Sequence, residues 1–238
     1  GLNKMAKELG SVETLRTDFI SNVSHEMKTP LAVIQNYGTL LQTPGLSDEK
    51  RVEYAKAINE QTRRMSTLIT NILKLNKLEN QQIYPNVQKY DLGEQLCECM
   101  LSFENDWEKK GIEIDADLAE DVMVNADPEM MSLVWNNLLS NAIKFTDQQG
   151  EISITIKKRN QKAEVSITDN GIGIPDNIKE KLFKINAKVI QKGTENESGN
   201  GLGLLLCSEF IKKHQGEIWA ESEFGKGSTF KFILPLEG

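Results

Sequence analysis

The sequence FISNVSHEMKTPLAVIQ, from Phe19 to Gln35, decides the architecture of the first part of the chain. Its apolar residues recur every three or four positions, as on one face of an α-helix: Phe19, Val23, Met27, Leu31 and Ile34. His25 lies beside this stripe and directly before Glu26. Pro30 lacks a backbone donor, so the carbonyl of Glu26 loses its helical partner. The helix therefore exposes an imidazole that a purely structural role would bury.

The composition limits the classes of protein that the chain can belong to. With 238 residues it exceeds a typical single domain, so two domains are expected. Its 28 basic and 35 acidic residues give a net charge of -7, which offers no electrostatic basis for binding nucleic acid. The three cysteines, two of them in Cys97-Glu98-Cys99, suit neither a disulfide framework nor a four-ligand metal site. We expect reduced thiols and no nucleic-acid partner.

The sequence contains no candidate for a membrane-spanning segment. No apolar stretch approaches the ~20 residues that span a bilayer, and no signal peptide precedes the first helix. The opening GLNKMAKELG is typical of a helix that continues from residues upstream. Contact with a membrane is therefore expected only through residues missing upstream.

The first part of the chain predicts two long helices and no strand. One helix runs to about Gln42 and the other from about Ser47 to about Glu79, with a turn through Pro44 and Gly45. The second helix carries apolar or small residues at the spacing of a heptad seam: Ala55, Ile58, Thr62, Met65, Ile69 and Ile72. One hairpin cannot cover this much apolar surface, so two copies are expected to pack as a homodimeric four-helix bundle. We place this domain at residues 1–84.

The second part, residues 85–238, predicts an α/β sandwich. A helix is expected over residues 92–107, ended by Gly111, and IEIDADL and DVMVNAD are short strand candidates. Asp127-Pro128 begins another helix, with an N-cap before a proline at the first helical position. EISITIKKR and KAEVSITD alternate with the period of a strand hairpin, and GEIWAESEFGKGSTFKFILPL supplies two more strands. One mixed sheet with helices on one face is the expected architecture.

The segment WNNLLSNAIKFT places polar side chains on one face of a predicted helix. Asn137 and Asn141 are four residues apart and Lys144 follows three residues later, so the three share a face. Buried asparagines often only satisfy hydrogen bonds within a core. Two carboxamides in line with a lysine can instead present oxygens to Mg²⁺ while the ammonium meets phosphate oxygens. We interpret this face as nucleotide-facing, with Asn141 as the metal ligand.

Two glycine segments are candidates for the rest of a nucleotide site. Asp169 ends a predicted strand before Gly171 and Gly173, which is often only a turn. A carboxylate beside open glycines also suits recognition of the adenine amine. A second glycine run precedes an apolar helix whose first amides favour phosphate: Gly199, Gly201 and Gly203. A dinucleotide-binding fingerprint is excluded, because it would follow the first strand of a parallel unit and this run follows a polar loop.

Taken in order, these segments resemble the sensor histidine kinases of two-component signalling over almost the whole chain. SHEMKTPL matches the phosphoacceptor motif, NLLSNAIKFT the N box and DNGIGIP the first glycine box. KLF resembles the F box, GNGLGL the second glycine box and GKGSTF the last glycine segment. The resemblance implies a phosphotransfer hairpin followed by an ATP-binding fold shared with gyrase, heat-shock-90 and mismatch-repair ATPases.

The resemblance also implies roles for particular residues. His25 would attack the γ-phosphate of Mg·ATP, with Glu26 accepting its ring proton, and the phosphoryl group would pass to an aspartate of a response regulator receiver domain. Thr29, one turn after His25, would orient a water that dephosphorylates that regulator. The implied ATP-binding residues are Asn137, Asn141, Lys144, Asp169, Gly171, Gly173, Phe183, Lys188, Lys192, Gly199, Gly201, Leu202, Gly203 and Thr229.

Two rival interpretations share the ATP-binding fold. An ATPase of a chaperone or topoisomerase would have no use for an exposed His25-Glu26 pair on a dimerising hairpin. A kinase-dead dimeric scaffold would not need the asparagines and glycines of the ATP site. The sequence leaves open whether His25 is served by the ATP domain of its own protomer or of its partner.

Two further expectations concern location and the second histidine. The resemblance implies that the chain is the cytoplasmic catalytic portion of a protein at the inner or cell membrane. His214 lies near the predicted end of a helix, in IKKHQG, and is expected to be structural.

Overall fold

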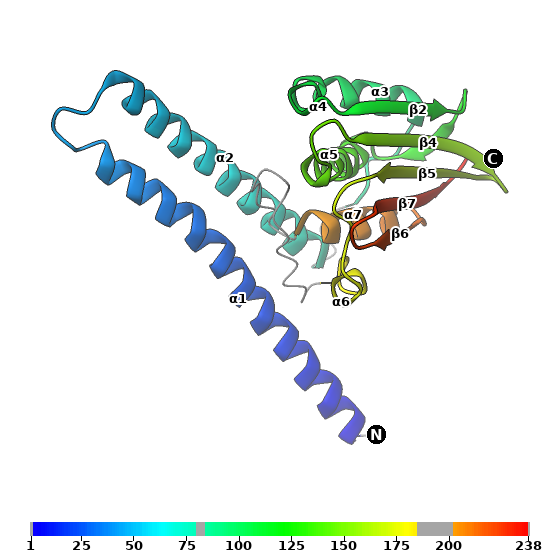
Figure 1. The fold of residues 1–238 in the computed structure, drawn as a ribbon. Helices are drawn as coiled ribbons and strands as arrows, with labels where there is room; N and C mark the ends of the chain where they lie inside the picture. The colour runs from blue at the N-terminus through cyan, green and yellow to red at the C-terminus, as the bar shows by residue number, and fades with distance from the viewer. Residues whose placement is uncertain (1, 80–83, 185–201, 238) are drawn as a thin grey trace. The chain divides into compact units, whose positions relative to one another are not determined.

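In a computed structural model, the chain divides into two compact units, residues 1–76 and residues 77–238. The structure describes residues 2–79, 84–184 and 202–237. Figure 1 shows that the first unit is a helical hairpin and that the second combines a sheet with helices. The expected order, helices first and an α/β fold second, is confirmed.

The helical hairpin forms as the sequence predicts. α1 covers Leu2–Leu40 and α2 covers Asp48–Glu79. In the turn between them Gly45 has a φ of 73°, a left-handed conformation that glycine adopts without strain. The rings of Tyr37 and Tyr54 lie with their centroids 5.2 Å apart and join the two helices near the turn.

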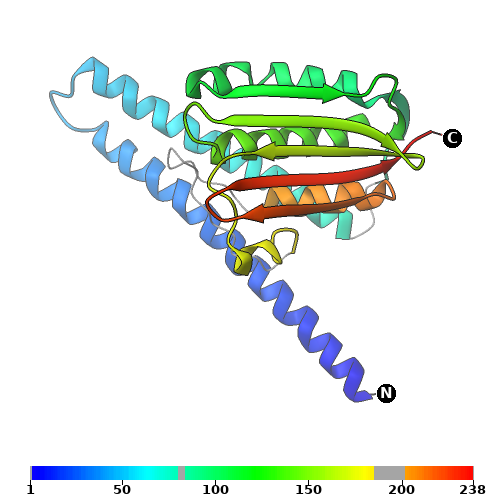
Figure 2. The same ribbon diagram turned by 45° about the vertical axis from the view of Figure 1, so that its right-hand side comes forward.

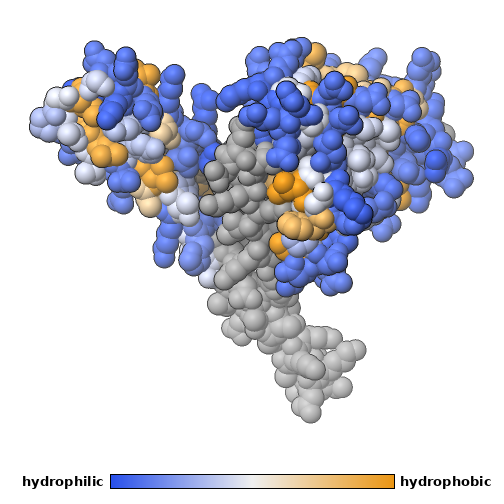
Figure 3. All heavy atoms as spheres, viewed as in Figure 1, coloured by the Kyte–Doolittle hydropathy of each residue, from blue (hydrophilic) through white to orange (hydrophobic). Residues whose placement is uncertain are grey.

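Apolar side chains of the hairpin are only partly covered. Leu31, on the apolar stripe of α1, is 45% exposed. In α2, three residues of the predicted seam are exposed, namely Ala55, Thr62 and Ile69, and three are half-buried, namely Ile58, Met65 and Ile72. Figure 3 shows apolar residues at the surface of the hairpin near its turn. The side chain of Phe19 lies outside the described residues.

The second unit contains a five-stranded mixed sheet with the strand order β2-β4-β5-β7-β6. β2 runs parallel to β4, and the other neighbouring strands are antiparallel. The strands are β2 Glu113–Leu118, β4 Glu151–Arg159, β5 Lys162–Asp169, β6 Glu217–Glu223 and β7 Gly227–Pro235. The predicted β4–β5 hairpin, the two further strands and the mixed character of the sheet are confirmed.

The prediction of a single sheet is wrong, because β3 does not join the five-stranded sheet. β3 (Met123–Ala126) pairs antiparallel with β1 (Gln88–Asp91) in a separate two-stranded sheet. The sequence QKYD of β1 is short and mostly polar, so it shows no strand periodicity. A strand candidate such as DVMVNAD does not reveal which partner it will pair with.

The helices of this unit are α3 Leu92–Leu101, α4 Glu104–Lys110, α5 Pro128–Phe145, α6 Asp176–Lys179 and α7 Leu202–Lys213. The single helix predicted over residues 92–107 is wrong, because the chain breaks between α3 and α4. At the break, the N–H of Ser102 donates to the carbonyl of Cys99 and the N–H of Phe103 to that of Met100, at 3.2 and 2.9 Å, and the Oγ of Ser102 also donates to the Cys99 oxygen at 2.7 Å. These contacts close the last turn of α3. Gly111 ends α4 in the left-handed conformation, as expected.

α5 and α7 cover one face of the five-stranded sheet, as Figure 2 shows. Trp135 of α5 and Phe232 of β7 are both fully buried, with ring centroids 5.2 Å apart. Alternate residues of β5 face the same core: Ala163, Val165 and Ile167. Burial of each large side chain stabilises the fold by about 1.5 to 3 kcal/mol, so this layer holds the helices firmly on the sheet.

A buried lysine that the sequence did not single out caps the C-terminal end of α5. Lys110 is 5% exposed, and its Nζ donates to the carbonyls of Ile143, Lys144 and Thr146 at 3.0, 3.3 and 3.4 Å. The last carbonyls of a helix have no partner within the helix, and a cation there also complements the helix dipole. Lys110 therefore fixes the end of the helix that carries Asn137, Asn141 and Lys144.

We predict that Lys110→Met lowers the free energy of unfolding by about 2 to 3 kcal/mol, because the buried carbonyls of α5 lose their donor. Urea unfolding would measure the change. Lys109→Met, an exposed substitution in the same turn, should change stability by less than about 0.5 kcal/mol. Equal effects of the two substitutions would contradict the capping role.

Candidate functional site

The polar face predicted on α5 exists, and its residues differ in their surroundings. Asn137 and Asn141 are half-buried, and Lys144 is 9% exposed. The Nδ2 of Asn137 donates to the carbonyl of Leu133 at 2.8 Å, whereas the carboxamide of Asn141 forms no hydrogen bond within the described part of the chain. The Nζ of Lys144 lies 4.8 Å from the ring centroid of Phe145. Asn141 is thus the carboxamide best placed to meet a ligand.

The first turn of α7 packs directly on Asn137. A Cβ atom added to Gly203 would lie 2.0 Å from the Oδ1 of Asn137, so no larger residue fits there. Leu202, the first residue of α7, is 7% exposed. Gly203 of the second glycine box therefore lies next to Asn137 of the N box. Four other predicted residues lie outside the described residues: Lys188, Lys192, Gly199 and Gly201.

Asp169 is a buried carboxylate at the end of β5. It is 5% exposed, and its Oδ1 accepts the N–H of Gly171 at 3.0 Å. Burial raises the pKa of Asp169 to about 6, although backbone hydrogen bonds from Gly171 and Ser228 partly oppose the shift. A buried, ionised carboxylate costs free energy unless it has a partner, which favours a donor from a ligand.

The loop after β5 passes closely between α5 and the β6–β7 hairpin. A Cβ atom on Gly171 would lie 2.0 Å from the carbonyl oxygen of Phe145, and one on Gly173 would lie 2.2 Å from that of Glu223. Gly173 also has a φ of 68°. The N–H of Ile172 donates to the Phe145 oxygen at 3.1 Å. The glycines are thus required for the backbone to reach this position, which lies next to the end of the N-box helix.

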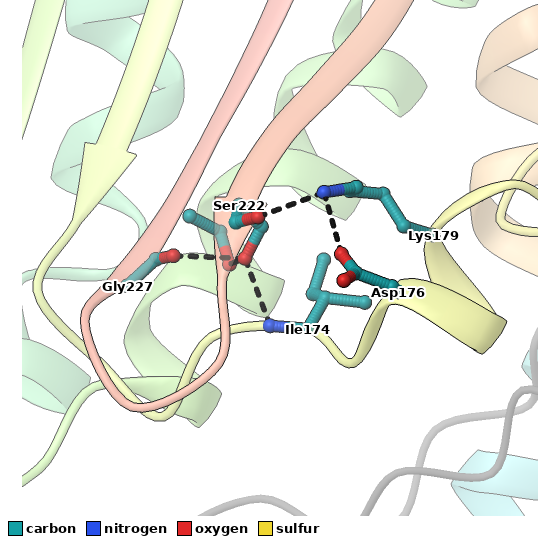
Figure 4. A network of polar contacts seen from close by, with 6 residues as sticks. Ile174, Asp176, Lys179, Ser222 and Gly227 are labelled. Atoms are coloured by element: carbon teal, nitrogen blue, oxygen red, sulfur yellow. Dashed lines mark hydrogen bonds and ion pairs between the residues drawn. The ribbon is translucent and has the colours of Figure 1, made fainter.

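A single hydroxyl joins this loop to the β6–β7 hairpin, as Figure 4 shows. The Oγ of Ser222 accepts the N–H of Ile174 and donates to the carbonyl of Gly227, both at 2.8 Å. The Nζ of Lys179 donates to the Ser222 carbonyl and to the Oδ1 of Asp176, both at 3.0 Å. The network holds the start of α6 and the loop containing Gly171 and Gly173 in one arrangement.

The structure does not place the side chain of Thr229 on the same face of the sheet as Asp169. Its Oγ1 lies 3.0 Å from that of Thr168, its partner across β5 and β7. The neighbouring pair, Ser228 opposite Asp169, points to the other face of the sheet, because successive side chains of a strand alternate. The Oγ of Ser228 lies 2.8 Å from that of Ser222. Ser228 is therefore the hydroxyl of GKGSTF that lies beside Asp169, and the sequence assignment to Thr229 missed it.

Phe183 packs against Phe230 of β7. Its ring meets the ring of Phe230 nearly edge-on, with centroids 6.3 Å apart and an interplanar angle of 79°. Phe230 is 7% exposed and lies two residues after Ser228 on β7. The F-box residue thus joins the segment after α6 to the strand that carries Ser228.

The candidate phosphotransfer residues lie together on α1. His25 and Thr29 are exposed and Glu26 is half-buried. The Oγ1 of Thr29 lies 3.4 Å from the carbonyl of His25, which it can reach as a donor. Pro30 lies inside α1, so Thr29 is helical and does not show the extended conformation that proline favours before it. His25 and Thr29 therefore present their side chains on one exposed helical face.

Comparison with known proteins identifies both units. Residues 15–81 match the family model of the His Kinase A phospho-acceptor domain, and residues 126–238 match that of the histidine kinase-, DNA gyrase B- and HSP90-like ATPases. The catalytic domain of histidine kinase ThkA is 32% identical, and this chain covers 96% of it, with a TM-score of 0.56. The chain belongs to the sensor histidine kinases. Its second unit is accordingly an ATP-binding domain, and the order of the two domains is the one that the motifs predict.

Relatives resemble this histidine kinase along its whole length. The adaptive-response sensory kinase SasA of Prochlorococcus marinus subsp. pastoris is 34% identical over 98% of the chain, and the sensor protein kinase WalK of Staphylococcus aureus is 30% identical over 97%. The chain spans 60% of that SasA and 56% of that WalK. A structure of ThkA in complex with response regulator TrrA is 25% identical over 99% of the chain, with a TM-score of 0.75.

Two features of the described residues concern metal ligands and membrane-spanning helices. No group of three or more His, Cys, Asp or Glu side chains that could hold a metal ion occurs within the described ranges. Across the described helices, none has the length and apolarity that crossing a membrane would require.

We predict that Asp169→Asn gains stability relative to wild type as the pH rises. The pKa of Asp169 is raised in the folded state, so folding favours its protonated form and wild type loses stability between about pH 4 and pH 6. Between pH 5 and pH 7.5 the variant should gain about 1.4 kcal/mol relative to wild type in urea unfolding. Asp117→Asn, at an exposed position of β2, should show no such trend. A constant difference for Asp169→Asn would mean that the carboxylate ionises normally.

Proposed function

We propose that this chain is the kinase portion of a sensor that phosphorylates His25 from Mg·ATP and passes the phosphoryl group to an aspartate of a response regulator. The observation that carries the proposal is the pairing of an exposed His25 on a helical hairpin with an ATP-type cluster of Asn137, Asn141 and Asp169 in the same chain. An ATPase without phosphotransfer would need only the second of these features.

The residues of the cluster suit ATP and Mg²⁺. The carboxamide of Asn141 is half-buried and has no hydrogen bond to another described residue, so its oxygen can coordinate the hard cation beside phosphate oxygens. Lys144 places a cation on the same face of α5. Asp169 can accept a hydrogen bond from the adenine amine, and the glycines beside it leave room for a flat ring. Ser228, which replaces Thr229 in this proposal, would complete the base pocket.

The chemistry assigned to His25 is a direct displacement at phosphorus. A ring nitrogen of the neutral imidazole forms a bond to the γ-phosphorus, the bond from that phosphorus to the bridging oxygen breaks, and ADP leaves. Glu26 accepts the proton from the other ring nitrogen, so the product is a neutral phosphorylated imidazole ring. The exposure of His25 suits both this attack and later approach of a second protein.

The response regulator and the homodimer are proposed partners. The structure of ThkA with response regulator TrrA supports a receiver domain as acceptor of the phosphoryl group. Apolar residues left exposed on the hairpin support pairing with a second copy into a four-helix bundle: Leu31, Val52, Ile69 and Leu73. We place the phosphotransfer domain at residues 1–84 and the ATP-binding domain at residues 85–238. The full-length protein would be held at the cell membrane through residues upstream, with these domains in the cytoplasm.

The proposal is tested first by His25→Gln. Incubation with γ-labelled ATP should label wild type with a phosphate that is acid-labile and base-stable, and the variant should lose the label completely, because the nucleophile is gone. The affinity for Mg·ATP, measured by calorimetry, should stay within about twofold, since His25 belongs to the other domain.

Three results would separate the rival functions. Binding and hydrolysis of ATP with no labelled wild-type protein would indicate an ATPase, and no binding would indicate a scaffold. Labelling that persists in His25→Gln would assign the nucleophile to another residue. Gln35→Ala, at an exposed position of α1, should be labelled like wild type.

We further predict that Thr29→Ala slows dephosphorylation of the phosphorylated regulator by about tenfold, or 1.4 kcal/mol, while autophosphorylation and forward transfer persist. The threonine hydroxyl would orient a water for attack on the acyl phosphate, which is a positioning effect. Thr29→Ser should retain most of the activity. The matched control is Thr39→Ala, because the Oγ1 of Thr39 donates to the carbonyl of Gln35 on the same helix. Phosphate decay equally fast with Thr29→Ala and wild type would leave Thr29 only a structural role.

A further inference from the structure

α5 and α7 contact each other at three successive positions along their lengths. At one end, the backbone N–H of Asp127 donates to the Nε2 of His214 at 2.9 Å. In the middle, the Sγ of Cys207 lies 4.0 Å from the carbonyl of Val134. At the other end, Gly203 packs on Asn137. The two helices therefore run antiparallel, and the contact at the nucleotide site is one end of a continuous interface.

Both ring nitrogens of His214 lie within hydrogen-bond distance of backbone groups. It is 8% exposed, its Nε2 accepts the N–H of Asp127, and its Nδ1 lies 2.7 Å from the carbonyl of Phe210. Only the neutral ring with its proton on Nδ1 makes both hydrogen bonds. His214 lies near the end of a helix, as expected, and it bonds across to the start of α5.

The carboxylate of Asp127 accepts hydrogen bonds from three backbone N–H groups near this contact. Its Oδ1 accepts the N–H groups of Glu129 and Met130 at 2.9 and 3.0 Å, which is the N-cap of α5. Its Oδ2 accepts the N–H of Asn86 at 2.7 Å. Asp127 is 6% exposed, so these bonds form away from water. The start of α5, the end of α7 and the segment before β1 are thus fastened together by two side chains.

We propose that His214 and Asp127 are positioning residues for the ATP site, which they set by holding α7 in register along α5. The inference rests on the proposed function. At the ATP-facing end of the interface Gly203 lies against the carboxamide of Asn137, since a Cβ there would be 2.0 Å from its Oδ1, so a shift of α7 would change the surroundings of that carboxamide. The C-terminal end of α5 is held by Lys110 and its first turn is capped by the Asp127 side chain, so loss of the His214 contact frees the end of α7 and not α5. A displacement of about 1 Å between Asn137 and the first turn of α7 is enough to weaken ligand contacts substantially.

The acceptor on His214 can be removed or restored by substitution. Gln places a side-chain oxygen near the position of Nε2 and can accept the Asp127 N–H, whereas Asn resembles Nδ1 and does not reach. His214→Leu removes both the acceptor at Nε2 and the donor at Nδ1. The control is Lys213→Gln, at an exposed position in the last turn of α7. The four variants of the whole chain would be compared at 10 °C, below the unfolding transition of each, by calorimetric titration with Mg·ATP.

We expect His214→Leu and His214→Asn to bind Mg·ATP about tenfold more weakly than wild type, and His214→Gln and Lys213→Gln to bind within about threefold of it. If His214→Leu does not fold, the Asn and Gln pair still decides the question. If His214→Asn and His214→Leu melt at lower temperatures but bind Mg·ATP as tightly as wild type, the proposal is overturned, because a purely structural role changes stability alone. The proposal is also overturned if His214→Gln and His214→Asn weaken Mg·ATP binding equally.

A second measurement separates failure of this inference from failure of the proposed function. In the protein without nucleotide, ¹⁵N-labelled samples report the amide resonance of Gly203 and the side-chain amide of Asn137. Both resonances should move in His214→Asn and return toward wild type in His214→Gln. If wild type binds no Mg·ATP, the proposed function fails and these shifts still test the register of α7. Unmoved resonances in His214→Asn would overturn the positioning role whether or not ATP binds.

Discussion

The fastening of α5 at both ends by buried charged side chains is the constraint on which the rest of the α/β unit depends. A helix leaves four N–H groups and four carbonyls without partners, and buried side chains supply partners at both ends of α5. Asp127 satisfies the first end and Lys110 the second. Because Trp135 lies fully buried between these ends, the helix cannot move without disrupting the core. Asn137 and Asn141, which the proposed ATP site takes from α5, are therefore held in fixed positions.

The site is assembled by close backbone approaches that only glycine permits. Gly203 on Asn137, Gly171 on the end of α5 and Gly173 on the β6–β7 hairpin bring three segments, distant in sequence, to one place. The arrangement also buries Asp169, whose raised pKa shows that its charge is costly in the folded protein. Buried groups with perturbed pKa values occur often at functional sites.

The two units differ in how far they expose their candidate functional residues. The hairpin keeps His25 and Thr29 on the surface of a continuous helix, where other proteins can reach them. The α/β unit encloses its polar residues among packed helices and strands. Each unit thus suits one half of a phosphotransfer reaction, since a nucleophile that must meet several partners needs access and a nucleotide pocket needs order.

Local sequence determined most of the elements of this protein and pointed to most of the residues of the proposed ATP site. Helical periodicity predicted α1 and α2, the Asp127-Pro128 pair predicted the start of α5, and alternation predicted the β4–β5 hairpin, because each of these signals lies within a few neighbouring residues. Only the tertiary structure decided which strand β3 pairs with, that Ser228 and not Thr229 lies beside Asp169, and that Lys110 and His214 hold the ends of the α5–α7 pair. Those outcomes depend on strand register and on contacts between segments far apart in the chain, and a register shift of one residue reverses which face a side chain occupies.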